Sequence, residues 1–474
     1  NITFVLLLSL LFLFMIWLPI SDSENWNFNK TLQVSNILLT LSIFILMSFS
    51  LNLHTGITGM VNFGVIFFVG VGAITVGILT APTEVHGYGW PVFPATIFAI
   101  LLAASFGWAL AYPTARLRMD YFAIVTISLG EIVRVLLAGE PLLRVGSIGS
   151  AIGISKYTLP LKNWWFCGPD ISVGPNSDYI SADTCRSDDL VNGPANMVGE
   201  FLNLSDSNGI IEPAPYMFLL AVMGILSVLL IWWFLETLLS SPWGRILKAI
   251  REDEEVAQHH GHDILKHKAA SLALGAGIAG LAGAFWAWKL TGFDPSIMAP
   301  ARSTFLVWAA FIIGGKANNK GMIIGAFIIV LMEFVFNVLV AAQGSSDLPL
   351  HSTADSIDRL FQWSITNQWE ASKIFILISL VGLILQRRLI TDIGLSGTFV
   401  FLFTLIMLGE RSITESFSGG ILKVDMAYVK VLLIGCLMLF SLKLNPKGLI
   451  PEVPFRPKKE LMVKSIVISE GDDK

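Results

Sequence analysis

The sequence predicts an all-α protein, a polytopic bundle of about 10–12 transmembrane helices. Of its 474 residues, 54% are hydrophobic and only 14% are charged, and the mean hydropathy is +0.70. Apolar runs of about twenty residues recur along the chain, and each is long enough to cross about 30 Å of hydrocarbon as a helix. The formal net charge of −4 gives no indication of nucleic-acid binding, so the expected surroundings are the lipid bilayer.

The candidate spans begin and end where the apolar runs do. In chain order they cover residues 2–20, 32–53, 63–80, 91–111, 121–138, 216–239, 269–291, 303–315, 321–342, 372–386, 398–409 and 428–443. The first run lacks a basic n-region and an Ala-x-Ala cleavage site, so we interpret it as a span rather than a signal peptide. A bundle with fewer spans and a re-entrant segment fits nearly as well.

The distribution of cations predicts the orientation. If the charged loop 240–268 is cytoplasmic, the other loops on that side are also the ones rich in Lys and Arg. They contain Arg116, Arg118, Lys316, Lys320, Arg387, Arg388 and the basic residues of the tail. We therefore expect a multi-pass protein of the cell (plasma) membrane with both termini in the cytoplasm.

This topology divides the chain into six segments. They are N-terminal transmembrane helices (1–140), an external polar insertion (141–215), a transmembrane core with the cytoplasmic coupling loop 240–268 (216–342), an external loop (343–371), C-terminal transmembrane helices (372–445) and a cytoplasmic tail (446–474). The insertion contains Cys167 and Cys185. A disulfide between them is allowed on an oxidising face, and two unconnected thiols are the alternative.

The charged loop has the signals of an amphipathic helix. Ser241 can cap its first turn, Pro242 suits the first helical position, and Gly261 suits a left-handed stop. These signals predict a helix from Trp243 to His260. Its apolar face is predicted to hold Ile246, Ala249, Ile250, Asp253 and Ala257, beside a basic stripe of Arg245, Lys248 and Arg251. Such a helix either contacts a soluble partner or lies on the lipid headgroups.

A glycine-rich stretch, His54–Gly64, interrupts the apolar sequence and is poorly suited to a continuous helix. Non-helical backbone at membrane depth occurs where protein or a water-lined cavity satisfies it. It is the best candidate for the translocation pathway, with Thr55, Gly56, Thr58, Gly59, Asn62 and Gly64 as the candidate residues. The alternative is a cytoplasmic turn followed by a glycine-rich packing helix.

Intramembrane charges and small residues are further candidates. Glu131 and Arg134 stand three residues apart and can form an ion pair, whereas Glu333 requires a partner from another helix. A structural ion pair is the simpler interpretation, with direct solute contact as the alternative. Gly277, Gly280 and Gly283 form small-xxx-small patterns that permit close helix packing and could transmit movement of the adjacent loop.

Catalytic and metal-binding motifs are not found. The sequence has no phosphate-binding Gly-x-x-x-x-Gly-Lys-Ser/Thr loop, no Gly-x-Ser-x-Gly elbow and no His-Glu-x-x-His helix. The histidines near the end of the charged helix converge poorly for a metal site. We therefore predict no catalytic residue, no metal and no cofactor.

Several stretches together resemble a known family. They are Leu51–Gly59 with Phe63–Gly64, Asp120–Thr126 with Gly130–Arg134, Ser241–Glu254 with Gly261, Ala279–Ala284 and Asn445–Leu449. The chain resembles the branched-chain amino acid ABC transporter permeases, specifically the second of their two paired membrane subunits. The resemblance implies a partner permease, cytoplasmic ABC ATPase subunits, an external solute-binding protein and a small-molecule substrate.

The same resemblance implies that the charged loop docks on the ATPase, which hydrolyses ATP in a separate chain. That coupling role is implied for Gly244, Arg245, Lys248, Ala249, Arg251, Glu252, Asp253 and Gly261. Urea and short-amide permeases share most of these motifs, and Asn62 and Val65 replace residues common in relatives. An ion-coupled secondary transporter using Glu131 and Glu333, or a membrane-bound scaffold, are the alternatives of other classes.

Overall fold

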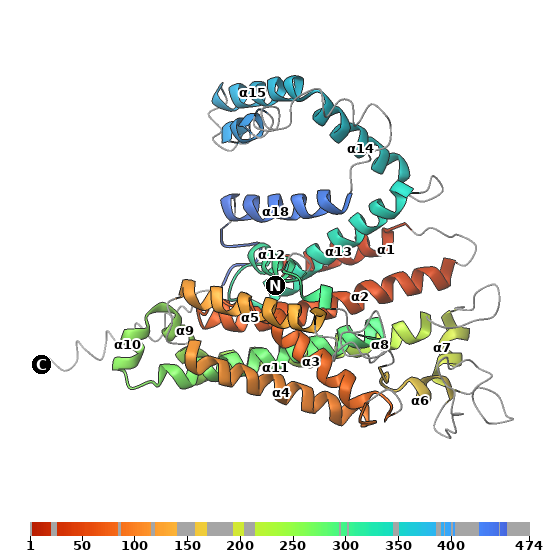
Figure 1. The fold of residues 1–474 in the computed structure, drawn as a ribbon, viewed down its shortest axis with the longest axis vertical. Coiled ribbons are helices and arrows are strands. Elements are labelled where there is room, and N and C mark those ends of the chain that lie inside the picture. The colour runs from red at the N-terminus through yellow and green to blue at the C-terminus, as the bar shows by residue number, and fades with distance from the viewer. Residues whose placement is uncertain are drawn as a thin grey trace, which may run out of the picture. The chain divides into compact units, whose positions relative to one another are not determined.

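The computed structural model describes residues 2–19, 26–83, 87–114, 119–139, 157–167, 193–202, 214–292, 295–300, 303–344, 350–384, 390–392, 394–399, 402, 426–444 and 446–452. All regular elements in these ranges are helical (Figure 1). The main helices are α1 (Ile2–Trp17), α2 (Trp26–Leu51), α3 (Val65–Thr80), α4 (Val92–Thr114), α5 (Met119–Gly139), α8 (Ala214–Ser240), α11 (Ile264–Leu290), α12 (Thr304–Gly314), α13 (Asn319–Gly344), α15 (Gln368–Ile384) and α18 (Met426–Leu444). Shorter elements are η1 (Asn52–Ile57), α6 (Lys162–Cys167), α7 (Pro194–Leu202), α9 (Pro242–Glu252), α10 (Glu254–His259), η5 (Pro295–Met298) and α14 (His351–Thr366).

The prediction of a polytopic helical bundle is confirmed. Among the described residues, six helices are long and apolar enough to cross a membrane, namely Trp26–Ile57, Val92–Pro113, Tyr121–Ala138, Tyr216–Ser240, Ile264–Leu290 and Asn319–Ala342. Shorter apolar helices cover Ile2–Trp17, Val65–Thr80, Thr304–Gly314 and Leu432–Lys443. The expected run at 398–409 lies mostly outside the described residues.

The chain divides into two compact units. The first comprises residues 1–17, 22–331 and 434–474, and the second comprises 18–21 and 332–433. Within the first unit, α11 is the central helix and contacts α2, α3 and α4, while α2 also packs along α8. α11 can pack against several helices because it is rich in small residues. Larger side chains at these contacts would hold the helix backbones apart.

Three glycines of α11 lie at these contacts. A Cβ on Gly280 would lie 2.8 Å from the Ala103 side chain of α4, and Gly277 faces the same helix. On another side of α11, a Cβ on Gly283 would overlap the Val69 carbonyl of α3. A Cβ on Gly72 of α3 would likewise overlap backbone of α11. The small-residue stripe therefore lies between two helices.

Tyr157 and Thr158 of the insertion lie against the end of α3. Thr158 donates a hydrogen bond of 2.7 Å from Oγ1 to the Thr80 carbonyl. The buried Tyr157 ring occupies the space that a side chain at Gly77 would need. Burial raises the pKa of the Tyr157 hydroxyl. The side chain of Cys167 and all of Cys185 lie outside the described residues, so their pairing stays a prediction.

The second unit contains a helix where the sequence led us to expect part of an external loop at 343–371. α14 places Ala354 and Ile357 against a cluster that includes Phe336 and Leu339. The Lys430 Nζ lies 3.6 Å from the Glu333 Oε1 within this unit. This helix was not predicted, because its few apolar residues are spread through a polar sequence. That residues 343–371 form an external connection stays a prediction.

Candidate functional site

The glycine-rich stretch forms a break between α2 and α3. α2 continues into the π-helical turn η1, and irregular backbone then runs from Thr58 to Gly64 before α3 begins. Gly59 has a φ of +83°, a left-handed conformation that favours glycine. Gly64 is also required, because a Cβ there would lie 2.6 Å from the Thr126 carbonyl. π-turns and broken membrane helices are frequent at functional positions.

His54 lies at the centre of this break and is fully buried. Asn62 accepts a 2.7 Å hydrogen bond at Oδ1 from the Gly64 N–H, so its amide nitrogen is the group that faces His54 Nδ1 at 3.0 Å. The Nδ1 atom must therefore accept. The proton lies on Nε2, which donates to the Leu272 carbonyl of α11 at 3.2 Å. This arrangement defines a neutral imidazole in one tautomer.

Hydroxyl groups satisfy the backbone that the break releases from helical bonding. Thr58 Oγ1 donates to the Leu53 carbonyl at 2.8 Å and lies 2.6 Å from Ser271 Oγ. Thr55 Oγ1 donates to the Met60 carbonyl at 3.0 Å. On the far side of the break, the Phe63 N–H donates to Thr126 Oγ1 at 3.1 Å. The broken segment, which comprises η1 and residues 58–64, is thus stabilised by hydrogen bonds to α5 and α11.

Asn52 joins the turn η1 to the loop before α13. Its Oδ1 accepts from the Ala317 N–H at 2.9 Å, and its Nδ2 donates to Asn319 Oδ1 at 2.9 Å. Ala317 has a φ of +62°, a strained conformation for a residue with a side chain. A Cβ at Gly56 would overlap Asn52 Oδ1, so the tight turn requires glycine there.

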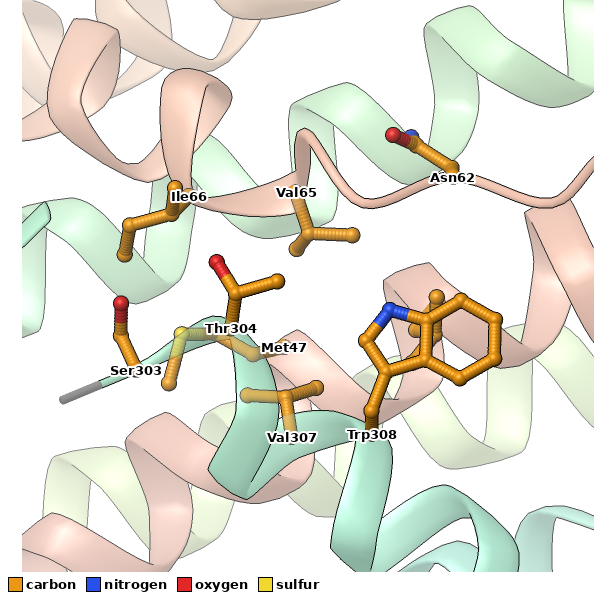
Figure 2. Close-up of a pocket in the computed structure, with 9 residues that line it drawn as sticks. Met47, Asn62, Val65, Ile66, Ser303, Thr304, Val307 and Trp308 are labelled. Atoms are coloured by element: carbon orange, nitrogen blue, oxygen red, sulfur yellow. The ribbon is translucent and has the colours of Figure 1, made fainter. Parts of the chain in front are cut away.

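Two cavities lie beside the broken segment, and Asn62 lines both. One is bounded mainly by the start of α3 and by α12, with Thr304 and Trp308 among its lining residues (Figure 2). The other is bounded by α3, α4, α5 and α11, with Thr126 and Leu272 in its lining. Thr55, Thr58 and Gly59 line neither cavity and instead hold the backbone of the break.

The charged loop does not form one continuous helix. α9 ends at Glu252, Asp253 adopts extended backbone with a φ of −157°, and its Oδ1 accepts from the Val256 N–H at 3.1 Å to cap α10. The prediction of a helix from Trp243 to His260 was wrong at this point, because an Asp side chain competes with helical bonding by capping the next turn. Gly261 adopts the expected left-handed conformation with a φ of +85°.

The buried face of α9 is shifted from the predicted one. Leu247 and Ile250 are buried together with Gly244, whereas Ala249 is exposed. A Cβ on Gly244 would overlap the Leu239 backbone at the end of α8. The exposed residues of the α9–α10 region include Arg245, Ala249, Glu252 and Asp253.

Arg251 points into its own chain. Its Nη1 donates to the Gly56 carbonyl at 2.6 Å, and its Nη2 lies 3.0 Å from Glu452 Oε2. Lys248 Nζ binds the other oxygen of Glu452 at 2.8 Å. The aliphatic part of Arg251 covers Gly59, where a Cβ would lie 3.1 Å from Arg251 Cγ. Arg251 therefore connects α9 directly to the broken segment.

Glu131 and Glu333, the two acids that the sequence indicates inside the membrane, each lie beside a cation. Arg134 binds Glu131 within α5, with an Nε–Oε2 distance of 2.9 Å and an Nη2–Oε1 distance of 2.5 Å. Glu333 lies near Lys430, as described above. Within the described ranges, no group of three or more His, Cys, Asp or Glu residues is arranged to hold a metal ion.

Most of the broken segment was predicted from its glycines, but the residues that hold it were not. His54, Asn52, Ser271 and Thr126 lie in apolar helices or at their ends, so periodicity gave no sign that they converge. The one available signal was composition, since buried polar side chains inside membrane spans need partners.

Comparisons with known proteins place the chain in a family. It is 28% identical to the "High-affinity branched-chain amino acid transport system permease protein LivM" of Escherichia coli (strain K12), over 65% of this chain and 64% of that protein. The corresponding Salmonella typhimurium protein is 27% identical, with the same shares covered. A "Probable branched-chain amino acid transport permease protein LivM" of Methanocaldococcus jannaschii is 25% identical, over 64% of this chain and 81% of the relative.

The chain thus matches just under two thirds of the length of the two bacterial relatives. No solved structure matches the chain. A family model described as "Branched-chain amino acid transport system / permease component" matches residues 33–383. Because this match covers well over half of the sequence, the chain belongs to the family of permease components of branched-chain amino acid transport systems.

Proposed function

We propose that this protein is the membrane-spanning permease subunit of an ABC importer that translocates branched-chain or related amino acids. The family membership, the transport function given in the names of its relatives and the apolar helices support this proposal. ATP hydrolysis takes place in separate cytoplasmic ATPase subunits. A second permease subunit and an external solute-binding protein complete the complex.

The contact that carries the proposal is Arg251 with the Gly56 carbonyl. α9 presents Arg245, Ala249 and Glu252 to solvent, while its other face ends in Arg251 on the broken segment. An ATPase that docks on the exposed face and moves α9 therefore pulls on η1 through one short, charge-assisted hydrogen bond. Since η1 connects α2 to α3, this movement changes the relative position of the helices beside both cavities.

The proposed orientation places α9, Glu452 and both termini in the cytoplasm, in the cell membrane. The insertion 141–215 then lies outside, where α6 and α7 are available to the solute-binding protein. In this arrangement the ATPase lies at the N-terminal end of α3 and the solute-binding protein at its C-terminal end. Movement at the cytoplasmic end and solute delivery at the external end are thereby connected.

The other candidate functions have less support. An ion-coupled transporter would use intramembrane acids as relays, but Glu131 and Glu333 each lie beside a cation. A urea or short-amide permease differs only in its solute, so it is tested by the same assay with a different substrate.

The experiment is ATPase activity and solute uptake by the complete complex in proteoliposomes. The binding protein is supplied with leucine, with another amino acid or with urea. Stimulation of both activities by leucine-loaded binding protein supports the proposal. Uptake that follows an ion gradient without ATP contradicts it, and stimulation by urea alone assigns the chain to the amide branch.

A further inference from the structure

The cavity in Figure 2 contains two buried hydrogen-bonding groups that have no partner among the residues that the structure describes. The Thr304 side chain is more than nine-tenths buried, with a relative exposure of 5%, and its Oγ1 has no hydrogen-bond partner. The Trp308 Nε1, one turn later in α12, is also buried without a partner. Both residues line this cavity. Leaving a buried polar group unpaired costs about 1–3 kcal/mol, so two in one cavity indicate a missing partner.

The two groups are held in place and face the same space. The Trp308 ring stacks on Phe63 of the broken segment, with centroids 4.4 Å apart and an angle of 15° between the planes. Figure 2 shows the Thr304 side chain and the indole nitrogen of Trp308 both directed toward the start of α3. The indole can only donate, and the Thr304 hydroxyl can donate as well. Their missing partner is therefore an acceptor.

The backbone around the cavity also favours a negative charge. α12 begins at Thr304 and α3 begins at Val65, and both residues line the cavity. The positive ends of two helix dipoles thus meet there. α12 has 11 residues and is about 16 Å long, which is too short to cross the hydrocarbon alone. Short helices whose N-termini end at membrane depth are suited to binding a carboxylate.

The walls of the cavity are apolar and consist of Met47, Leu51, Val65, Ile66 and Val307. Two further polar residues are among the described residues of the lining, Asn62 and Ser303, and the Ser303 hydroxyl donates to the Ala299 carbonyl at 3.2 Å. An aliphatic side chain can pack against these walls, while its carboxylate meets the two donors. This combination selects an amino acid with a branched aliphatic side chain over urea, which has neither a charge nor an aliphatic group.

We infer that the cavity between α12 and the start of α3 is a binding subsite for an aliphatic amino acid, with Thr304 Oγ1 and Trp308 Nε1 donating to its carboxylate. The inference rests on the proposed transport function and assigns a place in the chain to the solute. The free volume of the cavity is about 10 Å³, which is room for about one water molecule and far less than the roughly 300–1,000 Å³ of ordinary ligand pockets. Binding therefore requires α3 and α12 to move apart.

The first test measures leucine taken up per ATP hydrolysed by the complete complex, with leucine-loaded binding protein at saturation. Thr304→Val and Trp308→Phe each remove one donor and keep most of the side-chain volume. We expect each to lower the ratio about tenfold, equivalent to about 1.4 kcal/mol. The matched controls are Thr80→Val, whose hydroxyl bonds within its own helix, and Trp288→Phe, whose buried indole also lacks a partner but lies elsewhere. We expect less than a twofold effect from either control.

The second test does not depend on transport. Thr304→Cys in the complex is labelled with a membrane-permeant maleimide, and the modified peptide is quantified by mass spectrometry. We expect leucine to slow labelling at least fivefold and isopentylamine, which lacks the carboxylate, to have no effect. Equal protection by both compounds would refute the assigned role of the two donors.

The outcomes separate this inference from the proposed function. Normal leucine uptake by the wild type and by both variants, without protection of the cysteine, overturns the subsite and leaves the transport function standing. Wild-type complex that takes up no branched-chain amino acid overturns the transport function. Protection of the cysteine by leucine in that case still supports the subsite.

Discussion

Replacing Arg251 by lysine tests whether α9 acts on the broken segment through a single contact. The 2.6 Å bond from Arg251 to the Gly56 carbonyl has a charged donor, and such bonds contribute about 1.5–3 kcal/mol. The ion pair with Glu452 is partly exposed, with 21% and 25% of the two side chains accessible, and contributes about 0–1 kcal/mol. A lysine keeps the charge but cannot span both partners.

We therefore expect Arg251→Lys to weaken attachment of α9 to η1 by about 2 kcal/mol, which shifts the equilibrium about 30-fold toward the detached form. In proteoliposomes, ATP hydrolysis should continue while leucine uptake per ATP falls at least tenfold. Glu452→Gln, which leaves the Gly56 bond intact, should lower the same ratio by less than about threefold. Arg359→Lys, on the exposed surface of α14, is the matched control.

An unchanged ratio of uptake to hydrolysis in Arg251→Lys would refute this reasoning. Loss of ATPase association in the same variant would indicate that Arg251 leaves Gly56 and contacts the partner directly. Co-purification of the ATPase subunits distinguishes these two results, since the first leaves association intact.

Three further predictions concern the supporting structure. Gly283→Ala should lower the free energy of unfolding by about 1–3 kcal/mol, because the added Cβ overlaps backbone of α3. Gly435→Ala should not lower it, because a Cβ there meets nothing within 4 Å. Thermal unfolding of the complex in detergent compares the two variants. His54→Phe should destabilise by a similar amount, because it leaves the buried Asn62 amide nitrogen without its acceptor, and equal melting temperatures for the variant and the wild type would contradict this. The Asp263 carboxylate caps α11, and the hydrogen bond from the Lys266 N–H holds the pKa of this carboxyl below its ordinary value of 3.8. Its contribution to stability is therefore present above that value and lost as the pH falls through the lower folded pKa. Asp263→Asn should reduce this loss in melting curves taken from above pH 3.8 to below the folded pKa, and parallel curves would count against the cap.

The sequence was sufficient for the helices and for the position of the break. Long apolar runs define α2, α8 and α11 because hydrocarbon requires every backbone group to be satisfied within the helix. Three glycines within a few residues likewise indicate the irregular backbone at Gly56–Gly64. These features depend on local composition, which a single sequence contains in full.

The contacts at the site required the fold. The orientation of Arg251 depends on Glu452, about two hundred positions later, and no periodicity relates the two residues. The helical break at Asp253 depends on which of two competing hydrogen bonds the Asp makes. The pairing of Thr304 and Trp308 around one cavity depends on Phe63, which stacks on Trp308 from a different part of the chain.

α3 is held at both of its ends by other parts of the chain. Its N-terminus begins at the break that Arg251 contacts, and its C-terminal turn is fixed by Thr158 and Tyr157 of the insertion. A 16-residue helix is about 24 Å long and behaves as a stiff rod. A displacement of one end along the helix axis therefore displaces the other end by the same distance. In the proposed complex, solute delivery at the external end and ATPase movement at the cytoplasmic end would therefore both act on the position of this one helix.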